Sequence, residues 1–336
     1  MADLIRVDDA YEVFSPLMEH FGAICSPRDF YWAVNDALHA AEAEEYDQRH
    51  AHMFAELEHV WERLLGFLPE QPQRLAFLDV GCGTGLVGGF VSSLCRQRVE
   101  VMDLLDPSEE MLKEVSQSAK TWGFKTNTRH GDIDGLQGED GQYDVVTINS
   151  VLHHVVELQA LLEKVQNLLK PGGILLTAQD PRNVANTQGD SILQARKAAV
   201  SCLQKKTPLR KKAREQIGRT VRQILCIRHD SPLAMRASKT LLESRVISRP
   251  MDESSLYAVT DVHVPGLPAS IGKGVDVDDL KRWMPDMHCQ ATYTYSFHGI
   301  CWTQLTQVEQ EREIQWWHDN DPHGTQMACV FRKFSG

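Results

Sequence analysis

The sequence predicts an α/β protein built on a largely parallel sheet. From Leu75 onward, short apolar runs alternate with helical segments, which is the pattern of parallel strands joined by helices. The first apolar run leads into three glycines at alternate positions, Gly81, Gly83 and Gly85, with a helical segment behind them. A chain of 336 residues suits one large domain, or one domain with an insert.

The predicted elements follow in regular order up to residue 180. The expected strands are Leu75–Val80, Val99–Leu105, Thr126–His130, Tyr143–Asn149 and Gly173–Gln179. The expected helices between them are Gly85–Cys95, Ser108–Trp122 and Val155–Leu169. The sequence Lys-Pro-Gly-Gly at 170–173 is a turn that ends the last helix and begins the fifth strand.

Residues 1–72 are predicted to be helical. Apolar side chains recur at spacings of three and four within 37–68, and Pro69 and Pro72 then end the pattern. The aromatic run Phe30-Tyr31-Trp32 is expected to pack in a core rather than to line a pocket. The repeating strand–helix core is therefore assigned to residues 73–182.

Two further segments follow this core. Residues 183–255 form a basic helical insert without a strand signal, in which Arg196–Arg222 holds ten Lys and Arg residues against one acid. Residues 256–336 are expected to complete the core with a helix at Val275–Met284 and strands near Gln290–Phe297 and Met327–Arg332. We expect the insert to act as a helical lid, because it contains neither strands nor a second glycine loop.

Composition narrows the class of protein. The chain is 42% hydrophobic and 24% charged, and no apolar run approaches the roughly 20 residues that cross a bilayer. The first residues lack the basic-then-apolar pattern of a signal peptide, and the eight cysteines contain no CxxC pair. A cytoplasmic protein without membrane contact is the simplest interpretation. The net charge of −11 also argues against a nucleic-acid partner.

The glycine loop alone has more than one interpretation. Glycines let the backbone turn sharply and approach a ligand closely. Gly83, Gly85 and Gly88 also have the GxGxxG spacing of a dinucleotide site, and a glycine turn can precede a helix without any ligand. The surrounding residues must therefore decide between these alternatives.

Four motifs between Leu75 and Asp180 resemble those of class I methyltransferases, which use S-adenosylmethionine (SAM). The first is Asp-Val-Gly-Cys-Gly-Thr-Gly at 79–85, and the second is Asp-Pro-Ser-Glu-Glu-Met-Leu at 106–112. The third is Gly-Asp-Ile at 131–133, and the fourth is Asn-Ser-Val-Leu-His-His at 149–154. The resemblance implies a Rossmann-like sheet of seven strands with the last pair antiparallel, N-terminal helices and a helical insert.

The resemblance also implies SAM as the cofactor and suggests which residues bind it. Asp106 would hold the ribose hydroxyls, with Asp103 as the alternative, because a carboxylate accepts two hydrogen bonds at once. Asp132 would bind the adenine amino group, and Cys82 would fill space in the loop. The full set of expected cofactor-binding residues is Tyr46, Asp79, Gly81, Cys82, Gly83, Gly85, Asp106, Pro107, Met111, Asp132, Ile133 and Asn149.

The candidates for a catalytic base are histidines near the carboxyl ends of the strands, where open α/β sheets bind ligands. His154 is the first candidate and His153 the second, since both follow the fourth strand. His263 is the third, because Asp261 beside it could orient its ring. No metal site is expected, because Asp180 at the end of the fifth strand has no partner carboxylate in the residues that follow.

The predicted function is methyl transfer from SAM to a small organic acceptor, with the acceptor atom (O, N or C) left open. The N-terminal helices resemble the lid of small-molecule methyltransferases, and Tyr46 in that lid would touch cofactor or substrate. The basic insert leaves an anionic acceptor as one option. Two alternatives remain, which are methylation of RNA, protein or a carrier-bound substrate, and SAM binding without catalysis.

Overall fold

The protein is described from a computed structural model, which defines residues 10–70, 74–136, 139–183, 192, 231–264, 274–296 and 305–335. A seven-stranded sheet forms its centre, in the order β3-β2-β1-β4-β5-β7-β6. The strands are β1 (Leu75–Val80), β2 (Val99–Asp106), β3 (Lys125–His130), β4 (Tyr143–Asn149), β5 (Leu169–Pro181), β6 (Met287–Tyr295) and β7 (Gln326–Lys333). The first five strands are parallel, and β7 runs antiparallel to both β5 and β6. The predicted sheet with an antiparallel last pair is therefore confirmed.

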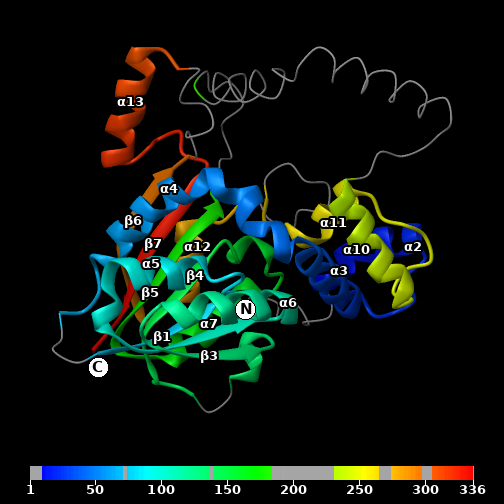
Figure 1. The fold of residues 1–336 in the computed structure, drawn as a ribbon, viewed down its shortest axis with the longest axis horizontal. Helices are drawn as coiled ribbons and strands as arrows, with labels where there is room; N and C mark the ends of the chain where they lie inside the picture. Colours follow the sequence, from blue (N-terminus) through cyan, green and yellow to red (C-terminus); the bar gives the residue numbers. More distant parts are fainter. Residues whose placement is uncertain are drawn as a thin grey trace.

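Helices cover both faces of this sheet (Figure 1). One face packs against α4 (Tyr46–Leu65), α5 (Leu86–Cys95) and α6 (Glu109–Ser118). The other face packs against α7 (Leu158–Leu168) and α12 (Val277–Trp283), while α13 (Gln307–His318) lies between β6 and β7 in the sequence. The start of α6 is fixed by Ser108, whose side chain accepts a hydrogen bond from the Met111 amide as an N-cap.

A second group of helices, which we call the cap, has a hydrophobic core of its own. The cap consists of η1 (Glu12–Phe14), α2 (Ser15–Phe21), α3 (Pro27–Glu42), α10 (Pro232–Glu243) and α11 (Glu253–Thr260). Phe14, Phe30 and Leu256 are completely buried among these elements, which lie together in Figure 1. The N-terminal helices and the described end of the insert thus form one packed unit. The domain boundaries at 72, 182 and 255 stay predictions.

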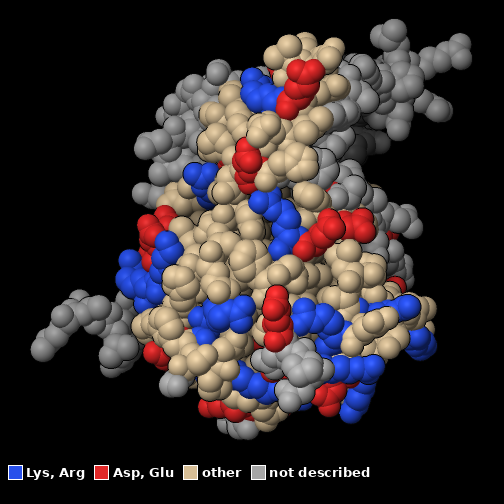
Figure 2. Space-filling view, turned by 90° about the vertical axis from the view of Figure 1, so that its left-hand side faces the viewer, with Lys and Arg blue, Asp and Glu red and all other residues tan. Residues whose placement is uncertain are grey.

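The surface agrees with a chain of mixed charge. On the side of the molecule that Figure 2 shows, Lys and Arg lie next to Asp and Glu over much of the surface. Within the described residues, no helix is both long enough and apolar enough to cross a membrane. The basic run Arg196–Arg222 lies outside the described residues.

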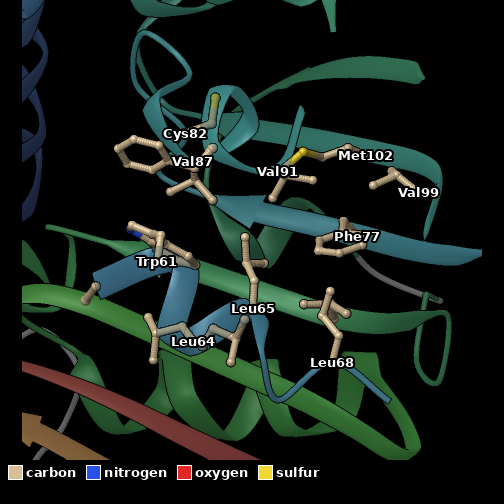
Figure 3. Close-up of a cluster of buried hydrophobic side chains, with 14 of the residues drawn as sticks. Trp61, Leu64, Leu65, Leu68, Phe77, Cys82, Val87, Val91, Val99 and Met102 are labelled. Atoms are coloured by element: carbon tan, nitrogen blue, oxygen red, sulfur yellow. The ribbon is translucent and has the colours of Figure 1, made fainter. Parts of the chain in front are cut away.

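Helix α4 joins the N-terminal region to the sheet. Its side chains Trp61, Leu64 and Leu65 belong to the same buried cluster as Phe77 of β1 and Val91 of α5, and Figure 3 shows this cluster. The Trp61 ring is fully buried, and its Nε1 donates a hydrogen bond of 3.0 Å to Asn149 Oδ1 at the end of β4. Burying a large aromatic side chain of this kind contributes about 1.5–3 kcal/mol. The helix is thereby anchored next to the carboxyl ends of the strands.

The predicted helical stretch over 37–68 is divided in the structure. The short helix η2 (Ala43–Glu45) separates α3 from α4. The division has a packing reason, because Leu38 of α3 belongs to the core of the cap whereas Trp61 of α4 belongs to the core of the sheet. The fifth strand also begins earlier than predicted, at Leu169, because Leu169 already pairs with Tyr143 of β4.

Candidate functional site

The glycine loop follows β1, and its three glycines adopt positive φ angles for different reasons. A Cβ on Gly81 would lie 2.4 Å from Val151, and one on Gly85 would lie 2.5 Å from Val115. Those two positions require glycine because of packing as well as φ values of +66° and +94°. A Cβ on Gly83 would meet no atom within 4 Å. Gly83 is therefore the glycine whose open side faces space that a ligand can fill.

Asp106, the last residue of β2, holds the loop in place. Its Oδ2 accepts a 2.8 Å hydrogen bond from the Gly83 amide, and its Oδ1 accepts one of 2.9 Å from the Ser108 amide. The carboxyl is buried, and burial raises its pKa although the two backbone bonds act in the other direction. Each carboxylate oxygen has two lone pairs, so Asp106 can still accept hydrogen bonds from a ligand.

Asp103, the alternative to Asp106, is committed elsewhere. Its carboxylate accepts hydrogen bonds from Arg129 at 2.8 Å, from Asn127 at 2.7 Å and from the Tyr143 hydroxyl at 2.8 Å. It does not line the pocket that Asp106 lines. The geometry therefore favours Asp106 for the ribose, as the sequence motif does.

A pocket of about 340 Å³ lies between the carboxyl ends of the strands and the cap. This volume falls in the range of small-molecule sites, about 300–1,000 Å³. Many of the predicted site residues line it, namely Tyr46, Gly81, Gly83, Asp106, Pro107, Met111, Asp132, Ile133, Asn149 and His154. Five predicted residues are not among the lining residues, namely Asp79, Cys82, Gly85, His153 and His263.

Asp79 and Cys82 do not line the pocket, although both belong to the first motif. Oδ1 of Asp79 accepts a 2.7 Å hydrogen bond from Thr147, whereas its Oδ2 is buried without a partner among the described residues. Burial raises the pKa of Asp79 to about 7. Burial also raises the pKa of the Cys82 thiol well above its usual value, which agrees with a space-filling side chain and not with a nucleophile.

The expected adenine end of the pocket is a turn stabilised by Asp132. Its Oδ1 accepts a 3.1 Å hydrogen bond from the Asp134 amide and caps η5 (Ile133–Gly135). Gly131, with a φ of +129°, donates its amide to the Asp106 carbonyl at 3.1 Å. A Cβ on Gly131 would meet no atom within 4 Å. The third motif is thus tied directly to the second, and both border the same pocket.

His154, the first candidate base, lines the pocket and has a defined orientation. It ends η6 (Leu152–His154), directly after β4, and its Nδ1 lies 2.9 Å from the Thr260 carbonyl oxygen and 3.3 Å from Asp261 Oδ1. A carbonyl oxygen only accepts, so Nδ1 carries the proton and Nε2 holds the lone pair of the neutral ring. Burial acts to lower the pKa of His154, but the hydrogen bond and charge of Asp261 outweigh it and raise that pKa.

The other two candidate histidines have different surroundings. His153 is buried, and its Nδ1 lies 2.9 Å from Asp180 Oδ1. His263 donates from Nε2 to the Val155 carbonyl at 2.9 Å, and its backbone amide donates to the His153 carbonyl. The expectation that Asp261 orients His263 is wrong, because the Asp261 carboxylate bonds to His154 instead. Neither residue lines the pocket that His154 lines.

Two of the described histidines and one aspartate form a group that could hold a metal ion. His153, His154 and Asp261 each offer one ligand atom, and these atoms lie within 4.8 Å of one another. The sequence did not predict this arrangement, because Asp261 lies far from His154 along the chain. His154 Nδ1 is already directed at the Thr260 carbonyl, which favours a hydrogen-bonded pair. The absence of a metal site stays a prediction.

The far side of the pocket comes from the cap, and sequence reasoning missed most of it. Its lining residues are Tyr11, Arg28, Tyr31, Trp32, Asn35, Asp36 and His39, together with Glu157 from the core. Four of them, Arg28, Tyr31, Asn35 and His39, recur at spacings of three and four along α3, so they share one face. This polar face was the signal available in the sequence, but the aromatic run beside it was assigned to a core.

Hydrogen bonds join the cap to the segment that carries His154. The Tyr31 hydroxyl donates to the His154 carbonyl, and the Tyr11 hydroxyl donates to Glu157 Oε2 at 2.9 Å. The His39 ring lies 5.4 Å from the His154 ring in an edge-on arrangement. Burial lowers the pKa of His39 to about 3, so this neighbour is neutral at physiological pH.

Comparison with known proteins agrees with this geometry. Residues 78–175 match a protein family described as a methyltransferase domain. Two curated relatives are ubiquinone biosynthesis O-methyltransferases, from Methylocella silvestris (29% identical, 33% of this chain, 42% of the relative) and Parvibaculum lavamentivorans (31% identical, 31% of this chain, 40% of the relative). A highly reducing polyketide synthase of Aspergillus aculeatus is 29% identical over 34% of this chain and 5% of its own length.

The chain therefore carries a methyltransferase domain of the class I, SAM-dependent kind, and SAM is the cofactor of that class. The sequence match is confined to about a third of this chain and spans less than half of the curated relatives. The cap and the parts after residue 180 lie beyond the matched domain. The N-terminal part of the cap supplies most of the far side of the pocket, so the acceptor must be inferred from the site itself.

Proposed function

We propose that this protein transfers the methyl group of SAM to a hydroxyl group of a small, uncharged organic acceptor. The observation that carries the proposal is the position of His154. It lines the same pocket as Gly83 and Asp106, and its Nδ1 is held as a donor, which leaves Nε2 free of the proton. The residues that we assign to the cofactor and a base of fixed tautomer thus border one pocket.

The residues present fit SAM. Gly83 leaves open space where a side chain would stand, and Asp106 offers free lone pairs beside it. Asp132 and Ile133 border the pocket at the expected adenine end. SAM supplies an already activated methyl group, so the protein must mainly position the acceptor and exclude water. The cap provides this cover.

A hydroxyl acceptor gives His154 a role. His154 Nε2 takes the hydroxyl proton while the oxygen attacks the methyl carbon, and the bond from that carbon to sulfur breaks with its electrons remaining on sulfur. The products are the methyl ether and S-adenosylhomocysteine, and His154 returns the proton to solvent. The printed names of two relatives, both O-methyltransferases of ubiquinone biosynthesis, support oxygen as the acceptor atom.

The charges around the pocket support an uncharged acceptor. Among its described lining residues are five acids, Asp36, Asp106, Asp132, Asp134 and Glu157, and one arginine, Arg28. That arginine lies 3.9 Å from Glu157, so its charge is already shared with an acid. An anionic acceptor would be repelled by this set. The anionic option rested on the basic insert, whose charged run lies outside the described residues.

A macromolecular acceptor is the alternative. The net charge of −11 and the mixed charges in Figure 2 favour a small molecule over a nucleic acid. Retention on heparin that weakens as salt rises, with transfer to RNA, would support the alternative and contradict our proposal. SAM binding without any transfer would instead support a non-catalytic protein.

The experiment is a transfer screen with methyl-labelled SAM and the full chain. Parallel reactions contain phenols and catechols, aliphatic alcohols, amines, total RNA and protein. We expect label in phenol or alcohol products, together with S-adenosylhomocysteine. Label found only in amines, RNA or protein would refute a hydroxyl acceptor.

A further inference from the structure

We propose that Asp261 is the positioning residue for His154, and that the cap thereby supplies the second half of a catalytic His–Asp pair. The inference rests on the proposed function for its catalytic meaning, but the pairing itself can be tested without an acceptor. Asp261 follows α11, so it belongs to the cap, whereas His154 belongs to the segment between β4 and α7. The pair therefore joins the cap to the segment between β4 and α7.

The contacts fix one tautomer of His154. Its Nδ1 lies 2.9 Å from the Thr260 carbonyl and 3.3 Å from Asp261 Oδ1. Both oxygens are acceptors, so a ring protonated at Nε2 alone would direct the Nδ1 lone pair at two other lone pairs. Protonation at Nδ1 removes that repulsion and leaves Nε2 as the basic atom. Two consecutive residues of the cap thus act together on one ring nitrogen.

Asp261 is also suited to stabilise the ring after it takes up a proton. Burial acts to raise the pKa of Asp261, but the hydrogen bond and charge of His154 outweigh it and lower that pKa. The carboxylate therefore remains ionised at neutral pH. An ionised carboxylate next to a histidine stabilises the imidazolium, which is the role of the acid in His–Asp catalytic pairs.

The nearby acid Asp180 does not perform this role. Its Oδ1 accepts a 3.1 Å hydrogen bond from the His153 backbone amide and lies 2.9 Å from His153 Nδ1. His153 does not line the pocket, and its ring lies tilted against that of His154, with 3.9 Å between the ring centroids. Asp180 thus supports the neighbour of the base, while Asp261 contacts the base itself.

The position of Asp261 on the cap has a consequence for the reaction. Packing of Leu256 and Val259 of α11 in the core of the cap sets where Thr260 and Asp261 stand. Two hydrogen bonds from His263, to the carbonyls of His153 and Val155, hold the same segment beside His154. The orientation of the base therefore depends on how the cap packs against the segment that follows β4.

The direct test is a histidine-selective nitrogen-15 NMR titration of the full chain, with the His154→Asn variant identifying the His154 resonances. We expect neutral His154 in the wild type to carry its proton on Nδ1. We also expect its pKa to be lower in Asp261→Asn than in the wild type. The titrating groups that face His154 are His39 from α3, His153 and Asp180 from the strand ends, and Asp261. Their own titrations are followed in the same spectra or by the matching variants.

The matched control is Asp252→Asn at the other end of the same helix. Asp252 caps α11 through the Ser255 amide at 2.9 Å, and Asn can also serve as an N-cap. This control should leave the His154 resonances and their titration unchanged. A wild-type ring protonated at Nε2, an unchanged pKa in Asp261→Asn, or the same change in Asp252→Asn would each overturn the proposal.

Kinetics give the second arm of the test, once the transfer screen has identified a phenol or alcohol acceptor. Asp261→Asn should lower kcat by about 10²-fold, the lower end of what a positioned base contributes, with unchanged SAM affinity. Wild-type kcat in Asp261→Asn, beside an inactive His154→Ala, would refute the positioning role alone. Full kcat in His154→Ala would refute the base itself and hence the mechanism under the proposed function.

Discussion

Replacing Asp106 with alanine is the sharpest test of the cofactor half of the site. The change removes the acceptor for the amides of Gly83 and Ser108, which are now bonded at 2.8 and 2.9 Å. Gly83 and Ser108 line the pocket, and burial raises the pKa of Asp106, so removing its charge restores part of the stability that is lost with the two hydrogen bonds. We expect the free energy of unfolding to fall by only about 1–2 kcal/mol.

The loss in SAM affinity should be larger than the loss in stability. Asp106→Ala removes the ribose acceptor, at a cost of about 1–3 kcal/mol, and frees the Gly83 backbone that shapes the loop. The two effects together predict a Kd for SAM that rises by about 10- to 100-fold. Isothermal titration calorimetry gives Kd, and denaturant unfolding without SAM gives the stability.

Asp103→Ala is the matched control, since Asp103 is an acid of the same strand with a structural role. Its loss leaves Arg129, Asn127 and Tyr143 without their common acceptor, so stability should fall by about 2–4 kcal/mol. The Kd for SAM should stay within about twofold of the wild type, because Asp103 does not line the pocket. A normal Kd in Asp106→Ala, or a weakened Kd in folded Asp103→Ala, would refute the assignment.

Two further predictions concern the glycine loop and Asp79, the acid of β1 that precedes it. Gly83→Val should abolish SAM binding in calorimetry, because a branched side chain would enter the open space beside the loop. The control variant Gly89→Ala in α5 should bind SAM normally. Equal binding by both variants would refute the role of Gly83 in SAM binding. The folded-state pKa of Asp79, about 7, lies above its unfolded value, so the stability that this carboxyl gives is present below pH 4 and is lost as pH rises through 7. Asp79→Asn keeps an acceptor for Thr147. It should raise the free energy of unfolding of the SAM-free protein by up to ~4 kcal/mol at pH 8, and with it the melting temperature, but should change neither at pH 4. An equal rise at both pH values would contradict this prediction.

The sheet was predictable because its signals are local. The predicted bounds of β1 and β4 agree with the structure, since both strands are short runs of mostly apolar, buried residues. The cofactor half was predictable for the same reason, because each motif directly follows a strand. The division between α3 and α4 was not predictable, because no Gly or Pro marks residues 43–45 and the division depends on which core each helix packs against.

The catalytic half shows where the sequence was insufficient. His154 could be proposed from its place after β4, but its partner could not. Asp261 is two residues from His263, and proximity along the chain pointed to that pair. The fold instead brings Asp261 to His154 by packing α11 into the cap, a contact between segments far apart in the sequence. The expectation that Tyr31 packs in a core is confirmed, because its ring is buried in the core of the cap, but the sequence did not indicate that Tyr31 also borders the pocket.

The central claim is that His154 acts as the base for methyl transfer inside a pocket formed by the SAM-binding loop and the cap. The most direct measurement compares single-turnover transfer from labelled SAM to a phenol or alcohol acceptor in the wild type and in His154→Ala, with SAM affinity measured on the same samples. We predict a rate about 10²–10⁴-fold lower in the variant and an unchanged Kd for SAM. A variant that transfers the methyl group at the wild-type rate across pH 6–9 would contradict the account.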